Sequence, residues 1–132
     1  MPEVTVQVKQ IDATASLGTA RQHQVNIDRP VAKEGTDTGA MGGELLLVSL
    51  GGCFISNLLA AIRAREAAVS NIDIQITGTL DSAPPRFSAV HMQITADYED
   101  RALMEKLVTI SERGCIVANT LKNAVDLSIT ID

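Results

Sequence analysis

Apolar and polar residues alternate along several short stretches of this chain, and a period of two is typical of strands with one buried face. This pattern predicts strands near both ends of the chain and in its middle. The stretches that show it are residues 4–9, 14–19, 23–28, 72–80 and 90–96, and then Leu127, Ile129 and Ile131.

A different pattern occupies residues 44–65, where apolar residues fill nearly every position and charges are confined to the two ends. A helix that is apolar on every side is typically buried in a core or in a bilayer. Gly51, Gly52 and Cys53 lie near its middle, and each glycine costs about 1 kcal/mol in a helix interior relative to alanine. We expect the close approach of another backbone or of a substrate to offset that cost.

Residues 45–62 are also about long enough to span a bilayer, which requires roughly 18 apolar residues. No aromatic belt flanks the segment, and Ser49, Ser56 and Asn57 would face lipid or need polar partners. Strands and helices elsewhere in the chain can cover such a helix instead. We therefore predict the central helix of a soluble domain, with no membrane partner.

The remaining segments complete a mixed fold. Residues 29–43 have the Gly, Thr, Asp and Pro composition of a loop, and two prolines at 84–85 separate the middle strands as a hairpin would. An apolar stripe over residues 103–110 predicts an amphipathic helix, and residues 115–124 predict a shorter helix. This order describes a single α+β domain over residues 1–132.

Composition excludes one class of function. The chain has two Phe, one Tyr and no Trp, and its formal net charge is -5. Proteins that bind nucleic acid use aromatic rings to stack on bases and positive charge to attract phosphates. We therefore expect no nucleic-acid partner, and the acidic balance favours solubility instead.

The cysteine count and the N-terminal sequence indicate the cytoplasm. Two cysteines are too few for the disulfide scaffold of a small secreted protein. The first ten residues alternate polar and apolar side chains and do not form a basic and then apolar leader. Paired cysteines in the cytoplasm are more often catalytic than structural.

The two thiols are the best candidates for chemistry. The sequence contains no cluster with metal-ligand spacing, no phosphate-binding glycine motif and no serine nucleophile motif. Cys53 shares a helical face with Ser49 and Asn57, four residues to either side. A buried free cysteine is commonly a small core residue with a raised pKa, so activation of Cys53 requires a nearby cation such as Arg21 or Arg29.

Cys115 has a different setting. It follows Arg113 and Gly114 at the expected start of a helix, where the helix dipole and the guanidinium both favour a thiolate. The alternative is an ordinary N-terminal residue of a packed helix. Cys53 and Cys115 are 62 positions apart (115 minus 53), so their sulfurs meet only if the two helices pack together. A disulfide requires Cα atoms within about 7 Å.

The segments around the two cysteines resemble the OsmC/Ohr family of thiol peroxidases and their relatives. These segments are ELLLVSLGGC at 44–53, GCIVANTLKNAV at 114–125 and the PPRF hairpin at 84–87. The match runs from about Arg21 to Asp132 and is closest to short OsmC-like proteins. It implies an OsmC-like fold, in which antiparallel sheet wraps a long buried central helix within an intertwined homodimer.

The same resemblance implies an enzyme, an organic hydroperoxide reductase that uses two cysteines. The Cys53 position is the peroxidatic thiol, which becomes a sulfenic acid, and the Cys115 position is the resolving thiol, which condenses with it to a disulfide. An external dithiol then reduces the disulfide, and no metal or organic cofactor is needed. The other catalytic positions that it suggests are Arg29, with Arg21 as the second choice, and Glu44.

The expected substrate is a small apolar hydroperoxide. Burying hydrocarbon is favourable by about 25 cal/mol per Å², which favours alkyl or fatty peroxides over hydrogen peroxide. The side chains expected at the substrate are Leu46, Ser49, Leu50, Phe54 and Ile116.

Two departures from the family pattern define the alternatives. Gly43 stands where the established peroxidases carry a Glu, and Ile116 replaces the Pro that commonly follows the second cysteine. The alternative function is a noncatalytic protein that keeps the family cavity and binds a small apolar or thiol-reactive ligand. In a third case, both cysteines are packing residues and the protein only makes partner contacts.

Overall fold

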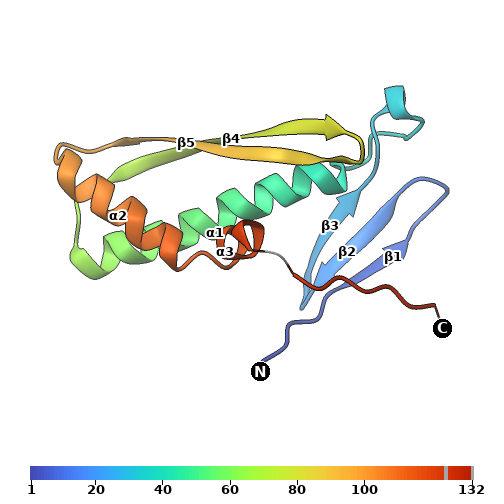
Figure 1. The fold of residues 1–132 in the computed structure, drawn as a ribbon, viewed down its shortest axis with the longest axis horizontal. Coiled ribbons are helices and arrows are strands. Elements are labelled where there is room, and N and C mark those ends of the chain that lie inside the picture. Colours follow the sequence, from blue (N-terminus) through green and yellow to red (C-terminus); the bar gives the residue numbers. More distant parts are fainter. Residues whose placement is uncertain (124, 132) are drawn as a thin grey trace. The chain divides into compact units, whose positions relative to one another are not determined.

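A computed structural model describes residues 1–123 and 125–131 of the chain. These residues form two compact units, one ending at Leu46 and the other beginning at Leu47. Within them, antiparallel sheets combine with three α-helices and one short 3-10 helix, so the predicted α+β class is confirmed (Figure 1). That the whole chain is a single domain stays a prediction.

The N-terminal unit contains a three-stranded antiparallel sheet. Its strands β1 (Gln7–Gln10), β2 (Ser16–Ala20) and β3 (His23–Ile27) pair in this order. Strand β1 begins later than the predicted start at residue 4, because β2 ends at Ala20 and leaves the preceding residues without a partner strand. The strands predicted at 14–19 and 23–28 are confirmed with small changes in their bounds.

A long loop follows β3, as the Gly, Thr and Asp composition predicts. It contains the 3-10 helix η1 (Val31–Lys33) and returns to the sheet, where the Asp28 N–H donates to the Ala40 carbonyl at 3.0 Å. The last two residues of the predicted loop, at 42–43, instead begin the long helix α1 (Gly42–Arg65).

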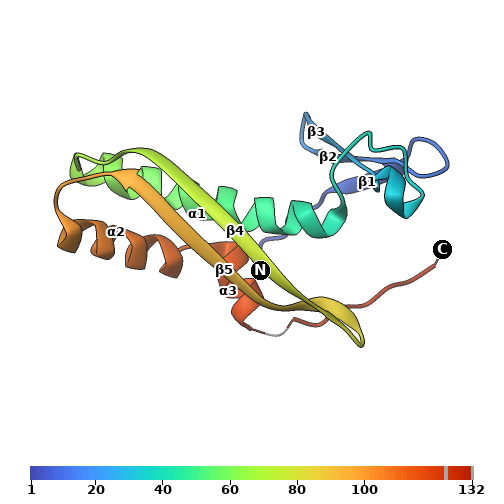
Figure 2. The ribbon, with the colours of Figure 1, turned by 90° about the horizontal axis from the view of Figure 1, so that it is seen from above.

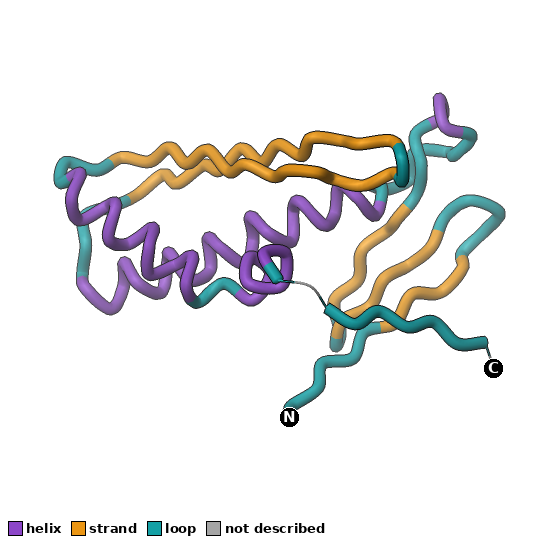
Figure 3. The backbone as a smooth tube through the Cα atoms, viewed as in Figure 1, coloured by secondary structure: helices purple, strands orange, loops and turns teal. Residues whose placement is uncertain are grey.

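The C-terminal unit has two layers, a long β-hairpin and a group of helices, as Figures 1 and 2 show from two sides. The hairpin confirms the two middle strands and the proline turn between them, with Ile76 opposite Met92 and Ser82 opposite Pro85. Its strands are β4 (Ser70–Ser82) and β5 (Pro85–Asp97), and the helices that follow are α2 (Arg101–Arg113) and α3 (Ile116–Lys122), drawn by type in Figure 3.

The core of this unit lies between the hairpin and the helices. Phe54 and Leu58 of α1 and Leu107 of α2 are at most 1% exposed. The inward residues of the hairpin pack against them at every second position, from Ile72 to Ile76 in β4 and from Val90 to Ala96 in β5. The strands therefore alternate with a period of two because helices cover one face of this sheet and the other face is open.

The prediction that α1 is buried on every side is wrong for the single chain. Its buried positions in this unit are Leu50, Gly51, Phe54, Leu58 and Ala61, which share one side of the helix. On the opposite side, Val48 is 62% exposed and Leu59 is 50% exposed, because the β4–β5 hairpin of this unit covers one face of the helix.

The two glycines of α1 lie on different faces. A Cβ atom on Gly51 would come within 2.7 Å of the Ile76 side chain, so the close approach of the hairpin explains this glycine. A Cβ atom on Gly52 would meet nothing within 4 Å. The expectation of a close neighbour is therefore confirmed for Gly51 and not for Gly52 in the single chain.

Helix α1 is, within the described residues, the one helix long and apolar enough to cross a membrane by length and composition, with 28% of its most apolar window buried. The core helix of a soluble protein meets the same criteria. The packing of Phe54 and Leu58 under the hairpin supports that second interpretation.

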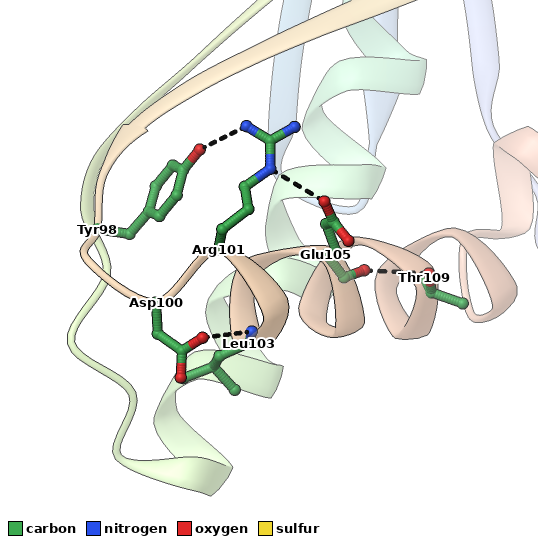
Figure 4. Close-up of polar contacts among 6 residues, drawn as sticks. All are labelled: Tyr98, Asp100, Arg101, Leu103, Glu105 and Thr109. Atoms are coloured by element: carbon green, nitrogen blue, oxygen red, sulfur yellow. Dashed lines mark hydrogen bonds and ion pairs between the residues drawn. The ribbon is translucent and has the colours of Figure 1, made fainter.

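Helix α2 begins where the acidic run predicts. The Asp100 carboxylate accepts a hydrogen bond from the Leu103 N–H at 3.0 Å, which caps the first turn (Figure 4). In the same view, Arg101 bonds Glu105 at 3.0 Å along the helix and the Tyr98 hydroxyl at 3.0 Å. These contacts are exposed and fix the corner between β5 and α2.

The predicted C-terminal strand is wrong for the single chain. Leu127, Ile129 and Ile131 are at least 84% exposed and belong to no strand in the described part of the chain. An alternating pattern makes a segment suitable for a sheet, but a strand also needs a neighbour that supplies hydrogen bonds. The predicted helix at 115–124 is confirmed as α3, with residue 124 outside the described residues.

Candidate active site

The sulfurs of Cys53 and Cys115 lie together although the residues are far apart in sequence. Cys53 is half-buried on α1, and Cys115 is completely buried at the turn between α2 and α3. The Cys115 thiol is within hydrogen-bonding reach of the Cys53 sulfur, and both cysteines are reduced. The packing of α1 against the α2–α3 corner brings them together, as the geometric condition in the sequence analysis requires.

The environment of Cys53 favours its thiolate. Burial raises the pKa of Cys53, but hydrogen bonds from the Val117 N–H, the Cys115 thiol and the Ile116 N–H act against burial. Together they place the pKa of Cys53 below its ordinary value. The first N–H groups of a helix have no partner within the helix, so the start of α3 supplies donors to an anion here.

Cys115 is held as a thiol. Burial raises its pKa, the Ala118 N–H opposes that effect, and the neighbouring Cys53 raises the pKa further. Its sulfur is also the N-cap of α3, accepting the Ala118 N–H at 3.4 Å. Of the two alternatives that the sequence left open for Cys115, a thiolate at the helix start and an ordinary N-terminal residue of a packed helix, the raised pKa favours the second. The thiolate is favoured at Cys53 instead, as the family resemblance implies.

This arrangement separates two chemical roles. A thiolate is the reactive form of cysteine, so the lowered pKa makes Cys53 the better candidate for a nucleophile of the two. The raised pKa of Cys115 favours its protonated form, which can donate a hydrogen bond to the Cys53 sulfur. Two groups of the same type whose pKa values are pushed apart are a common feature of active sites.

An apolar cleft of about 340 Å³ lies beside the cysteines but contains neither of them in its wall. Two predicted substrate-site residues, Leu50 and Phe54, line it from α1, and β5, α2 and α3 form the other sides. The ion pair between Lys122 and Glu112 lies at this cleft. The cleft lies near the thiols because Ala118, which lines it, donates its N–H to the Cys115 sulfur.

The other predicted substrate-site residues lie on the surface. Leu46 is 40% exposed and Ile116 is 75% exposed, and Ser49 is exposed as well. The backbone of Ile116 takes part in the thiol site through its N–H, while its side chain points away from the core. The substrate role of these three side chains stays a prediction.

The two predicted charged residues belong to the N-terminal unit. Glu44 lies in the first turn of α1, where its carboxylate accepts the Met41 N–H at 2.8 Å, which is a capping contact. Arg29 is exposed in the loop after β3. A pairing of either residue, or of Arg21, with Cys53 would join two separate units and stays a prediction.

One residue of that loop escaped the sequence analysis. Asp28 is 3% exposed, and its carboxylate accepts five hydrogen bonds, from the Arg29 N–H and from the N–H and hydroxyl groups of Thr36 and Thr38. These bonds, led by the Thr36 hydroxyl, hold the pKa of Asp28 far below its usual range despite burial. The sequence feature that could have identified this buried carboxylate is an Asp directly before a loop that contains Thr36 and Thr38.

No group of three His, Cys, Asp or Glu residues within the described ranges could hold a metal ion.

Comparison with known proteins identifies the fold. A putative osmotic stress induced and detoxification response protein from Psychrobacter arcticus has a TM-score of 0.78 and 22% identity, covering 91% of this chain and 89% of that chain. A hypothetical protein from Aquifex aeolicus has a TM-score of 0.78 and 19% identity, with coverages of 92% and 89%. The organic hydroperoxide resistance protein OhrB of Bacillus subtilis has a TM-score of 0.64 and 18% identity, with coverages of 94% and 93%.

A search of curated proteins found no match. The family model described as OsmC-like protein matches residues 35–130, which include both cysteines, the hairpin and all three α-helices. This match spans most of the sequence, and the chain therefore belongs to the OsmC-like protein family.

Proposed function

We propose that this protein is a thiol-dependent peroxidase that reduces organic hydroperoxides to alcohols through Cys53 and Cys115. It would act in the cytoplasm with an external dithiol as reductant and without a metal or organic cofactor. The observation that carries the proposal is the contact between the two thiols, one with a lowered pKa and the other with a raised pKa. Membership of the OsmC-like family and structural likeness to hydroperoxide resistance proteins agree with it.

The reaction has three balanced steps. The Cys53 thiolate attacks one peroxide oxygen, so that an S–O bond forms, the O–O bond breaks and the alkoxide leaves and takes up a proton. The Cys115 sulfur then attacks the sulfenic acid, forming the S–S bond and releasing water with the proton of Cys115. An external dithiol reduces this disulfide and becomes a disulfide itself.

Four further roles belong to the proposal. Arg29, or Arg21 in its place, would stabilise the Cys53 thiolate, and Glu44 would orient that guanidinium. The apolar part of the peroxide would lie against Leu50 and Phe54. The other expected contacts of the substrate are Leu46, Ser49 and Ile116.

The open face of α1 supports a homodimer. Val48, Gly52, Ser56 and Leu59 recur at intervals of three or four residues, and all four are exposed in the single chain. Small residues on such a face permit close helix contact, and the two large apolar ones gain from burial. A second copy of this chain would cover them. A Val48→Glu, Leu59→Glu double variant should then elute at the monomer size in size-exclusion chromatography.

The test of the activity is steady-state reduction of cumene hydroperoxide and tert-butyl hydroperoxide with a dithiol. We expect Cys53→Ser to lose essentially all turnover. Cys115→Ser should still form a sulfenic acid at Cys53, which dimedone traps for mass spectrometry. Equal turnover of the wild type and Cys53→Ser would disprove the proposal.

The apolar cleft favours one second candidate, a noncatalytic protein that binds a small apolar ligand. Its volume of about 340 Å³ suits a small molecule, and neither sulfur lines it. In that case an apolar fluorescent probe should bind equally well to the wild type and to Cys53→Ser, with no peroxide turnover by either protein.

A further inference from the structure

At the C-terminal end of α2, the carbonyl of Ser111 is satisfied by a side chain from another helix. The Gly114 N–H donates to the Ile110 carbonyl, and the Cys115 N–H donates to the Glu112 carbonyl, both at 3.2 Å. In a regular helix the Cys115 N–H would instead bond the carbonyl of Ser111, four residues earlier. The N–H groups of this tightened last turn therefore do not use the Ser111 carbonyl as their acceptor.

The side chain of Asn57 supplies the missing donor. Its amide nitrogen donates to the Ser111 carbonyl at 3.4 Å, across 54 positions of sequence. Asn57 lies four residues after Cys53, on the same face of α1 and one turn further along. It is half-buried, and Ser111 is completely buried. The hydrogen bond therefore joins the helix of one cysteine to the turn that carries the other.

The same amide lies against the residue that precedes Cys115. A Cβ atom on Gly114 would be 3.4 Å from the Asn57 amide nitrogen, the shortest distance at this glycine. The turn therefore packs against α1 at Asn57, and Cys115 follows immediately. Cys115 then begins α3, whose first N–H groups, at Ile116 and Val117, reach the Cys53 sulfur.

We propose that Asn57 is a positioning residue, which holds the Gly114–Cys115 turn against α1 so that the Cys115 sulfur faces the Cys53 sulfur. This inference rests on the proposed two-cysteine reaction and adds a residue to it. The step that Asn57 assists is disulfide closure, in which the S–S bond forms, the S–O bond of the sulfenic acid breaks and water leaves. A correctly placed sulfur closes the disulfide faster because less motion is required.

The chain provides a matched control in Asn119. Its amide nitrogen donates to the Arg113 carbonyl at 3.1 Å, so it also satisfies the C-terminal end of α2. Asn119 belongs to α3, however, and does not connect to α1. Replacing it removes an amide hydrogen bond from the same helix end without affecting the link between the two cysteine-bearing segments.

The test measures the effective concentration of the two thiols at equilibrium with reduced and oxidised glutathione. In this exchange two glutathione thiols become one glutathione disulfide as the Cys53–Cys115 disulfide is reduced, and the reverse. We expect Asn57→Ala to lower the effective concentration roughly fivefold, the size of one lost hydrogen bond. Asn119→Ala should change it by less than about twofold.

Asn57→Asp is the second variant, because it keeps the shape of the side chain and lacks the N–H donor. It should behave like Asn57→Ala, and it decides the question if the alanine variant does not fold. Dimedone trapping after one equivalent of cumene hydroperoxide should detect more sulfenic acid in both variants than in Asn119→Ala. An unchanged effective concentration in the Asn57 variants, or an equal fall in Asn119→Ala, would overturn the positioning role.

The glutathione measurement needs no peroxide, so it separates this inference from the proposed function. A wild type that forms the disulfide but does not turn over cumene hydroperoxide would disprove the peroxidase and leave the Asn57 result valid. If the wild type turns over cumene hydroperoxide fully and Asn57→Ala has no effect on the effective concentration, the positioning role is disproved and the peroxidase remains supported.

Discussion

Two groups of this protein are stabilised as anions by hydrogen bonds, and they differ in how completely they are satisfied. The Asp28 carboxylate in the N-terminal unit is 3% exposed and accepts five bonds. The Cys53 sulfur in the C-terminal unit is half-buried and meets two N–H groups and one thiol. Both pKa values are lowered.

This difference in hydrogen bonding corresponds to a difference between a structural group and a group that can react. A carboxylate whose lone pairs are all engaged organises the loop around it and has no capacity left to react. A thiolate with fewer donors and some exposure keeps a lone pair for an incoming substrate. Hydrogen bonding therefore organises the loop at Asp28 and lowers the pKa of the thiol at Cys53.

The largest expected effect is the loss of the Asp28 carboxylate. Asp28→Ala leaves five donors of the loop without their acceptor, so we expect a melting temperature lower by on the order of 5 °C or more. Asp12→Ala is the matched control, because the Asp12 carboxylate accepts two N–H groups in an exposed turn. Equal shifts in thermal melts of the two variants would contradict the role of burial.

The Asp28 carboxylate also predicts how the stability of the protein falls at acidic pH. The folded pKa of Asp28 is lowered, so its stabilisation is fully present above the unfolded value of about 3.9 and is lost as pH falls from there toward the folded pKa. Thermal melts of the wild type should show this loss below about pH 4. Asp28→Asn should have a lower melting temperature than the wild type at neutral pH. Its melting temperature should also change less as the pH falls below about 4.

The next effect is expected at Gly39, in the loop that Asp28 organises. A Cβ atom there would come within 2.3 Å of the Asn26 backbone oxygen, which cannot move aside as a flexible side chain can. We expect Gly39→Ala to cost about 2 kcal/mol of unfolding free energy, measured by urea denaturation. A neutral result would mean that the loop adapts more easily than its hydrogen bonds suggest.

Removal of the Cys115 thiol should change reactivity more than stability. Its hydrogen bond helps to lower the pKa of Cys53, so in Cys115→Ala that pKa should rise and alkylation near pH 7 should slow about tenfold. Cys115→Ser keeps a hydroxyl donor and the N-cap of α3, and it should stay closer to the wild type. Iodoacetamide labelling of Cys53 against pH distinguishes them. Identical profiles for the two variants would assign the activation to the α3 amides.

The smallest effect is expected at Gly114. Its φ is -92°, which other residues adopt, and a Cβ atom would meet the Asn57 amide at 3.4 Å, an ordinary contact. Gly114→Ala should therefore change the unfolding free energy by less than about 1 kcal/mol in urea. A large loss would mean that the turn before Cys115 is packed more tightly than the loop at Gly39.

Periodicity predicted most of the secondary structure of this protein. The hairpin strands, the stripe of α2 and the start of α3 appear where their patterns indicate, because each pattern reflects packing against a neighbour within the chain. It failed at Leu127 to Ile131 and on the open face of α1, where the apolar pattern has no neighbour in the single chain. These two failures share one cause, since a pattern records that burial is required but not what provides it.

The candidate site was predicted in part. Spacing and composition singled out the two thiols, and residues four positions apart on α1 placed Asn57 near Cys53. The amide donors of Ile116 and Val117 and the five bonds of Asp28 were not predictable from residue types. Every residue but proline carries a backbone N–H, so its usefulness depends on the geometry of the helix end.

The sequence by itself determined most of the segments that become helices and strands, which residues carry sulfur, and that a long apolar helix must be covered. Local spacing contains this information because side chains three, four or two positions apart share a face. The tertiary structure decided which thiol has the lower pKa. That difference depends on the N–H groups of Ile116 and Val117 at the start of α3, which the packing of α1 against the α2–α3 corner brings to Cys53.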